Sequence, residues 1–425
     1  MRKRSICTAI AVLVASTGAL PADAQTKSSA QVVKAPVAQL WMDVATITMP
    51  GMPEIPGMGS MMGMLGGGGG GGAGGGNAFG NTRSMSPGRY VDIALHTQRK
   101  PAGTEAAQTV PVVTGLAPSL PLVPPKAEAP APKSERSTPE SYERPKGRIL
   151  FYWGCGETVR PGQPRVIDFA KGGPEEWGTF MQGRAPRERG AQSVTGNALW
   201  PNERDRRSFT REASLVGDHA VTGDGVPAGL KFAISSLHDF MPGIALTQSG
   251  SPAAVVNASW QPVANAQAYF LNAMSGGNDE LVFWSSSEVP DFGMGLMDYA
   301  SPANIEQWLK EKVLLPTSTT QCAIPNGIFA KAQGGMLRMI AFGPELNLAY
   351  PPRPSDVKVA WEPEWAVRVR TKSMAMSMLG MDAGERRGGR SSRSAPSQGQ
   401  PPADAPQDEP KMPGAVDLLK GIFGK

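Results

Sequence analysis

Residues 90–97 have the sequence YVDIALHT, and their alternation of apolar and polar side chains is the pattern on which the fold assignment rests. In an extended chain Val91, Ile93 and Leu95 point to one face, while the residues between them point to the other. The same period of two returns at residues 365–371, WAVRVRT. Both stretches therefore predict half-buried β-strands.

Runs of apolar and β-branched residues predict further strands along most of the chain. They lie at residues 41–49, 148–153, 165–169, 211–216, 230–234, 253–260, 267–274, 280–286, 321–329, 336–342 and 346–350. A helical pattern is found at residues 302–314, after a start signal at Ser301 and Pro302. We expect a mainly β fold: two β-sandwich-like units with long disordered loops, one short internal helix and a C-terminal amphipathic helix.

Composition suggests how these elements are organised. The chain has 425 residues with 51 Gly and 40 Pro, and much of that Gly and Pro sits in a few segments that have little to bury. We expect a signal peptide at 1–24, a loose N-terminus at 25–40, a first β-sandwich unit at 41–242 with disordered insertions at 50–88 and 101–146, a second unit at 243–372, a disordered linker at 373–413 and an amphipathic helix at 414–425.

The first 24 residues have the three parts of a secretory signal peptide. Arg2, Lys3 and Arg4 precede an apolar run from Ile6 to Leu20, and Ala22-Asp23-Ala24 forms a small-x-small cleavage site. We expect a mature chain that begins near Gln25 and is exported to the periplasm, the outer-membrane surface or the extracellular space.

Charge argues against nucleic acid as a partner. The formal net charge is +5, of which the leader contributes two units, and no clustered basic face is apparent. The glycine run at 66–72 lacks the Lys and Ser or Thr of a phosphate-binding loop. We expect no cofactor.

Residues 257–269, NASWQPVANAQAY, resemble the start of a fibronectin type III domain. Trp260, Pro262, Ala266 and Tyr269 match that family in order and spacing. The resemblance covers about residues 243–352 and implies that Trp260 and Tyr269 pack between two sheets. It also implies a module that binds or spaces, and it brings no active site. The first unit resembles no family that we can name.

The mature chain would contain two cysteines, Cys155 and Cys322. In an oxidising compartment such a pair favours a disulfide, which we expect to link the two units. The alternative is two buried thiols, because free cysteine packs like a small apolar residue.

A hydrolase site is the enzymatic alternative. Cys155 could act as a nucleophile if His219, next to Asp218, supplied a base. Residues 279 and 280 form an acid pair in a polar loop beside Gly, which we interpret as solvated carboxylates. Catalysis therefore remains open, and we incline to a protein that is not an enzyme.

Methionine is concentrated before the glycine run and suggests a weaker alternative, periplasmic metal handling. Thioethers suit Cu(I), but no His or Cys is interleaved, and Met also makes adaptable apolar surfaces. The candidate ligands are Met52, Met58, Met61, Met62 and Met64.

The segment at 414–425, GAVDLLKGIFGK, has an apolar helical face that could make a peripheral membrane contact. Together these features favour an exported, non-catalytic binding or scaffolding protein of a bacterial envelope. Its expected partner is an envelope protein or a glycan.

Overall fold

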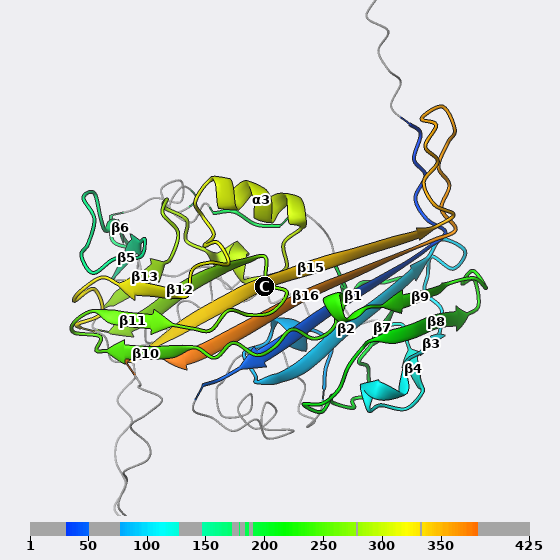
Figure 1. The fold of residues 1–425 in the computed structure, drawn as a ribbon, viewed down its shortest axis with the longest axis horizontal. Coiled ribbons are helices and arrows are strands. Elements are labelled where there is room, and N and C mark those ends of the chain that lie inside the picture. Colours follow the sequence, from blue (N-terminus) through cyan, green and yellow to red (C-terminus); the bar gives the residue numbers. More distant parts are fainter. Residues whose placement is uncertain are drawn as a thin grey trace, which may run out of the picture.

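A computed structural model describes residues 31–50, 77–126, 147–171, 178, 183–186, 190–277, 279–331 and 334–380. It confirms the mainly β fold, with a central nine-stranded sheet and two smaller sheets. The strands β15 and β16 are the longest and cross the molecule from end to end (Figure 1). The central sheet contains, in spatial order, β6 (Arg165–Asp168), β5 (Arg148–Trp153), β13 (Glu280–Ser285), β12 (Ala268–Gly277), β15 (Gly335–Tyr350), β16 (Trp365–Met378), β1 (Ala38–Thr48), β2 (Gly88–Thr97) and β7 (Asn197–Trp200).

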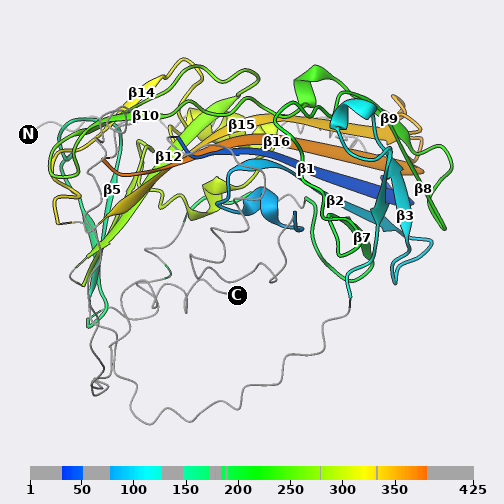
Figure 2. The ribbon, with the colours of Figure 1, turned by 90° about the horizontal axis from the view of Figure 1, so that it is seen from below.

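Two small sheets cover one face of the central sheet. Figure 2 shows the central sheet as a curved layer, with β10 and β14 over one end and β3 and β8 at the other. The three-stranded sheet contains β10 (Thr247–Gly250), β11 (Val256–Ser259) and β14 (Gln321–Ile324). The four-stranded sheet contains β4 (Ser119–Leu122), β3 (Ala106–Thr109), β8 (Gly217–Gly223) and β9 (Lys231–Ile234).

Each small sheet encloses its own apolar core. Leu40, Met42 and Val44 of β1 pack in one cluster with residues of the four-stranded sheet. Tyr269 and Leu271 of β12 pack in another cluster, with residues of the three-stranded sheet. Each half of the central sheet thus forms a sandwich with a different partner sheet.

Helical elements and loops cover the opposite face. The helix α3 (Pro302–Lys310) begins where predicted, with Ser301 accepting a hydrogen bond from the Asn304 N–H. Its residues Ile305 and Trp308 pack with Phe270 of β12. The short 3₁₀-helices η1 (Asn81–Arg83) and η4 (Met294–Met297) lie on the same face of the central sheet as α3. The other two, η2 (Val112–Thr114) and η3 (Ser236–His238), lie in connections between strands.

The predicted division at residue 243 does not follow the sheet. The strands β5 and β6 come from the first predicted unit, yet β5 pairs with β13 at the far edge from β1 and β2. Conversely, β16 from the second predicted unit pairs in parallel with β1 along eleven residues each. Because β-pairing can join distant segments, the two stretches of sequence share one sheet.

The expected disordered insertion at 101–146 is wrong for residues 101–126. This stretch forms β3, η2 and β4, and Leu120 and Leu122 are buried. Its proline content suggested a linker, but β4 is an edge strand, where Pro121 removes no hydrogen bond that a neighbour needs. Likewise, within the expected insertion at 50–88, residues 77–88 include η1 and the first residue of β2.

The expected linker at 373–413 is wrong at its start, because β16 continues to Met378. Ser373 and Ala375 are small and buried, and Met374 and Met376 fill the core beside α3. Small residues weaken the hydrophobic signal of a strand although they fit under a covering sheet.

The predicted strand at 211–216 is absent, because the strand in this region begins at Gly217. The sequence patterns also did not predict β7, β8 or β10.

Trp260 and Tyr269 are both buried, with their ring centroids 5.6 Å apart in an edge-on arrangement. Trp260 directly follows β11 of the three-stranded sheet, whereas Tyr269 belongs to β12 of the central sheet. The two rings therefore meet between facing sheets. Nearby, Cys155 after β5 is bonded to Cys322 of β14, with Cα atoms 5.1 Å apart, so a covalent bond also joins these layers.

Candidate functional site

A group of charged side chains is buried where β1, β2 and β16 adjoin. Asp43 of β1 faces Arg370 of β16, and the two form a bidentate pair with both N–O distances at 2.8 Å. Gly190 lies directly over this pair, since a Cβ there would come within 1.6 Å of the Arg370 Nη2. Only glycine allows the backbone to approach the ion pair so closely.

Arg83 of η1 extends the pair into a network. Its Nη2 lies 3.0 Å from the Asp43 Oδ2, and its Nε lies 3.0 Å from the Asp298 Oδ2. Burial opposes the charge of Arg83, but Asp298 and Asp43 outweigh it and raise the pKa of the guanidinium. Arg83 therefore stays charged and ties η1 both to the sheet and to the segment after η4.

Lys372 is the most deeply buried cation of the network. Its side chain is fully enclosed, its Nζ lies 3.7 Å from the Asp298 Oδ1 and 4.5 Å from the Tyr299 ring centroid, and it donates to the Met297 carbonyl. Burial lowers the pKa of Lys372 to about 8, although Asp298 opposes the shift. The Arg370 guanidinium also stacks 4.5 Å from the same Tyr299 ring.

Asp92 of β2 is the register partner of Asp43 and lies beside the network. Its carboxylate accepts hydrogen bonds from the Gly80 N–H, at 2.9 Å, and from the Thr82 hydroxyl. Burial raises the pKa of Asp92 to about 6, against the effect of these two hydrogen bonds. The carboxylate holds the loop around η1 on the sheet.

The chemistry of this network is structural. The two carboxylates, Asp43 and Asp298, bind the three cations of the network. Asp298 and Arg83 have the most exposed side chains of the group, and the other three are buried. Each of these ion pairs joins two different segments of the chain. The network fastens the covering loops to the sheet and presents no unpaired charged group to a substrate.

The structure does not bring together the residues of the predicted hydrolase site. Cys155 is in the disulfide with Cys322, so it has no thiol to ionise. Asp218 and His219 lie in β8 of the four-stranded sheet, over the other half of the central sheet. The His219 ring is buried; its Nε2 is 2.8 Å from the Leu215 carbonyl, and it stacks on Phe232. It is therefore a histidine of the hydrophobic core and not a catalytic base beside Cys155.

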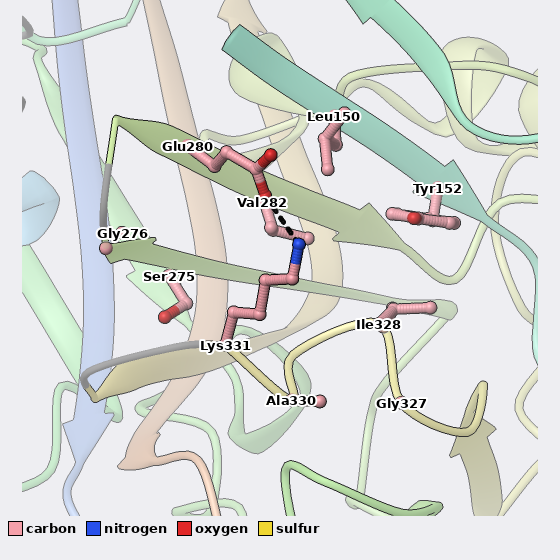
Figure 3. Close-up of a pocket in the computed structure, with 11 residues that line it drawn as sticks. Leu150, Tyr152, Ser275, Gly276, Glu280, Val282, Gly327, Ile328, Ala330 and Lys331 are labelled. Carbon is pink, nitrogen blue, oxygen red and sulfur yellow. Dashed lines mark ion pairs between the residues drawn. The ribbon is translucent and has the colours of Figure 1, made fainter. Parts of the chain in front are cut away.

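A pocket of about 160 Å³ opens at the end of the sandwich that contains the disulfide (Figure 3). Leu150 and Tyr152 come from β5, and Val282 from β13. Glu280 and Lys331 form its charged part, with 4.0 Å between the Lys331 Nζ and the Glu280 Oε2. The remaining lining residues are Ser275, Gly276, Gly277, Gly327, Ile328 and Ala330.

Glu280 is not the solvated carboxylate that the sequence suggested. Its side chain is only 15% exposed, and its Oε1 accepts a hydrogen bond from Arg148. Arg148 is the register partner of Glu280 on the neighbouring strand β5. One feature of the sequence could have predicted this position. Glu280 directly precedes an apolar run, so it begins a strand, and a side chain at the end of a strand can line the open end of a sandwich.

Several expected sites lie outside the described residues: the leader 1–24, the helix 414–425, and Met52, Met58, Met61, Met62 and Met64. In the part of the chain that the structure describes, no three His, Cys, Asp or Glu side chains are grouped as metal ligands. No helix among these residues has the length and apolar character needed to cross a membrane.

Comparison with known proteins adds no relative. No protein family, curated protein or solved structure matches the chain. The resemblance of residues 243–352 to the fibronectin type III family stays a prediction.

Proposed function

We propose that the chain is an exported, non-catalytic binding or scaffolding protein of a bacterial envelope. The observation that carries this proposal is that the candidate reactive side chains are bonded to, or packed against, other parts of the fold. Cys155 is in a disulfide, His219 is packed in a core, and Asp43, Arg370, Arg83 and Lys372 are held in one internal network. These described residues, which include the candidate catalytic Cys155 and His219, hold the fold together.

The disulfide supports the location. Disulfides persist in oxidising compartments and are uncommon in the cytosol of mesophiles. The Cys155–Cys322 bond joins the segment after β5 to β14 and so links two layers of the sandwich. A bond of this kind would persist in an exported protein. The leader-like sequence at 1–24 points in the same direction.

Fractionation of cells that express the full-length chain tests this proposal. We expect the main species in an extracytoplasmic fraction, beginning at or near Gln25, with no thiol that reacts under denaturing conditions. We also expect the purified protein to co-sediment with isolated envelopes. A main soluble species in the cytoplasm that keeps Met1 and has three reactive thiols, Cys7, Cys155 and Cys322, would overturn the proposal.

A further inference from the structure

Apolar side chains of β5 and β13 form part of the floor of the pocket in Figure 3, and Ser275 of β12 completes it. Leu150, Val282 and Ser275 lie side by side on three adjacent strands, because Val282 is the register partner of both other residues. Ile328, in the segment after β14, lines the same space. This floor is the open end of the core that the three-stranded sheet covers, so an apolar ligand face placed there extends an existing core.

Tyr152 adds an aromatic wall to that floor. It lies two residues after Leu150 on β5, and its partly buried ring packs against the same core. An aromatic ring beside aliphatic side chains is a surface that the C–H groups of a saturated ring can pack on. The apolar part of the pocket thus suits a ring that has a nonpolar face.

The polar part of the pocket consists of two opposite charges that do not touch. The Glu280 Oε2 and the Lys331 Nζ are 4.0 Å apart, which is too far for a hydrogen bond. A hydroxyl group both donates and accepts, so one placed here donates to Glu280 and accepts from Lys331. A carboxylate on the ligand would face Glu280, and an ammonium group would face Lys331, so a neutral hydroxyl fits both charges better than either ion.

Size limits the ligand further. The pocket volume of about 160 Å³ is below the range of about 300–1,000 Å³ that is usual for drug-sized ligands. The space admits one ring and leaves the rest of a longer molecule outside. We propose that this pocket binds a single neutral sugar ring of a glycan, with its C–H face on Tyr152 and its hydroxyls between Glu280 and Lys331.

This inference rests on the proposed function as a binding protein and names its ligand class. Saturation-transfer NMR with the purified mature protein tests it, using the methyl glycosides of glucose, galactose and N-acetylglucosamine as probes. We expect at least one glycoside to bind with a dissociation constant of about 1 mM, typical of one ring in an open site. Glycerol has hydroxyls without a ring, benzoate has a ring without hydroxyls, and neither should bind.

Variants locate the binding. K331M removes an ammonium group whose side chain is 79% exposed, so it leaves the fold intact and should weaken binding about tenfold. E280Q should weaken it similarly, while Y152A should abolish it and Y152F should bind as the wild type does. K310M is the matched control, because Lys310 is an equally exposed lysine paired with Glu306 on α3.

Three results would overturn the inference: no transfer to any glycoside, equal transfer to benzoate or glycerol, or equal affinity in K331M and K310M. Each leaves the proposed function standing if the protein is still exported and still co-sediments with envelopes. Sugar binding by a protein that stays in the cytoplasm would instead reject the location and keep the pocket assignment.

Discussion

Asp43 and Arg370 are 327 residues apart in the sequence, yet they are direct neighbours on parallel strands and share two hydrogen bonds. Their side chains are 1% and 5% exposed, so the pair lies in a region of low dielectric constant. A buried ion pair contributes little relative to an apolar pair, but the loss of one partner leaves an uncompensated charge. The stability of the seam between β1 and β16 therefore depends on both residues together.

Replacing Arg370 alone should be costly. We expect R370M to lower the free energy of unfolding by about 3–5 kcal/mol, because Asp43 would keep only Arg83 as a charged partner. The double variant D43L/R370M should lose clearly less than the sum of the two single variants. Urea unfolding measures all three, with K310M as an exposed control that changes stability by about 0.5 kcal/mol or less. Additive losses would show that the pair is not coupled.

The pH dependence of stability should reveal Asp92. Its folded pKa of about 6 lies above the ordinary carboxyl value of 3.8, so its contribution is present below pH 3.8 and is lost as the pH rises through 6. Relative to D92N, which does not titrate, the wild type should lose about 3 kcal/mol between those limits. Chemical unfolding of both proteins across this range gives the difference. A constant difference would mean that Asp92 titrates normally.

Lys372 should act at the opposite end of the pH scale. Its folded pKa of about 8 lies below the ordinary lysine value of 10.5, so its contribution is present above pH 10.5 and is lost as the pH falls through 8. Measured against K372M, the wild type should gain about 3 kcal/mol as the pH rises over this interval. An unchanged difference between the two proteins would place the ammonium group in contact with water.

The disulfide should contribute strongly to stability. It closes a loop with a sequence separation of 167 residues, for which the chain-entropy model gives about 5 kcal/mol as an upper value. The variant C155A/C322A should unfold at a lower temperature than the oxidised wild type. Reductant should lower the midpoint of the wild type and leave that of the double variant unchanged. Equal midpoints for all samples would show that the bond adds nothing.

Trp260 should contribute strongly to the stability of its sandwich. We expect W260A to cost about 3–5 kcal/mol, since the indole is 3% exposed and packs on Tyr269 between facing sheets. V357A is a suitable comparison, because Val357 is 50% exposed. A loss below 1 kcal/mol in W260A, measured by thermal or urea unfolding, would contradict the packing described here.

Sequence patterns identified individual strands more readily than their arrangement. The alternation in β2 and the apolar run in β5 are local properties, and both strands lie where they were predicted. The pairing of β1 with β16 depends on residues far apart in the chain, and no local pattern encodes it. The pattern therefore suggested two separate units where one sheet exists.

The charged network was missed for a related reason. Alternating Arg368, Arg370 and Lys372 indicates a strand with one solvated face, because most charged side chains contact water. Lys372 is nevertheless enclosed, since Asp298 and Tyr299 reach it from a segment that lies 74 and 73 positions earlier in the sequence. Only the fold shows that the covering segment supplies the opposite charge.

The pairing of β1 with β16 also sets the order in which the molecule can form. A growing chain presents β1 early, but its parallel partner ends at Met378 and emerges only after most of the sequence. Until then β1 has β2 on one side and an open edge on the other, a state prone to incorrect pairing. The central sheet is therefore completed late, when β16 pairs with β1. Because this step depends on contacts between residues far apart in the sequence, we expect slow folding.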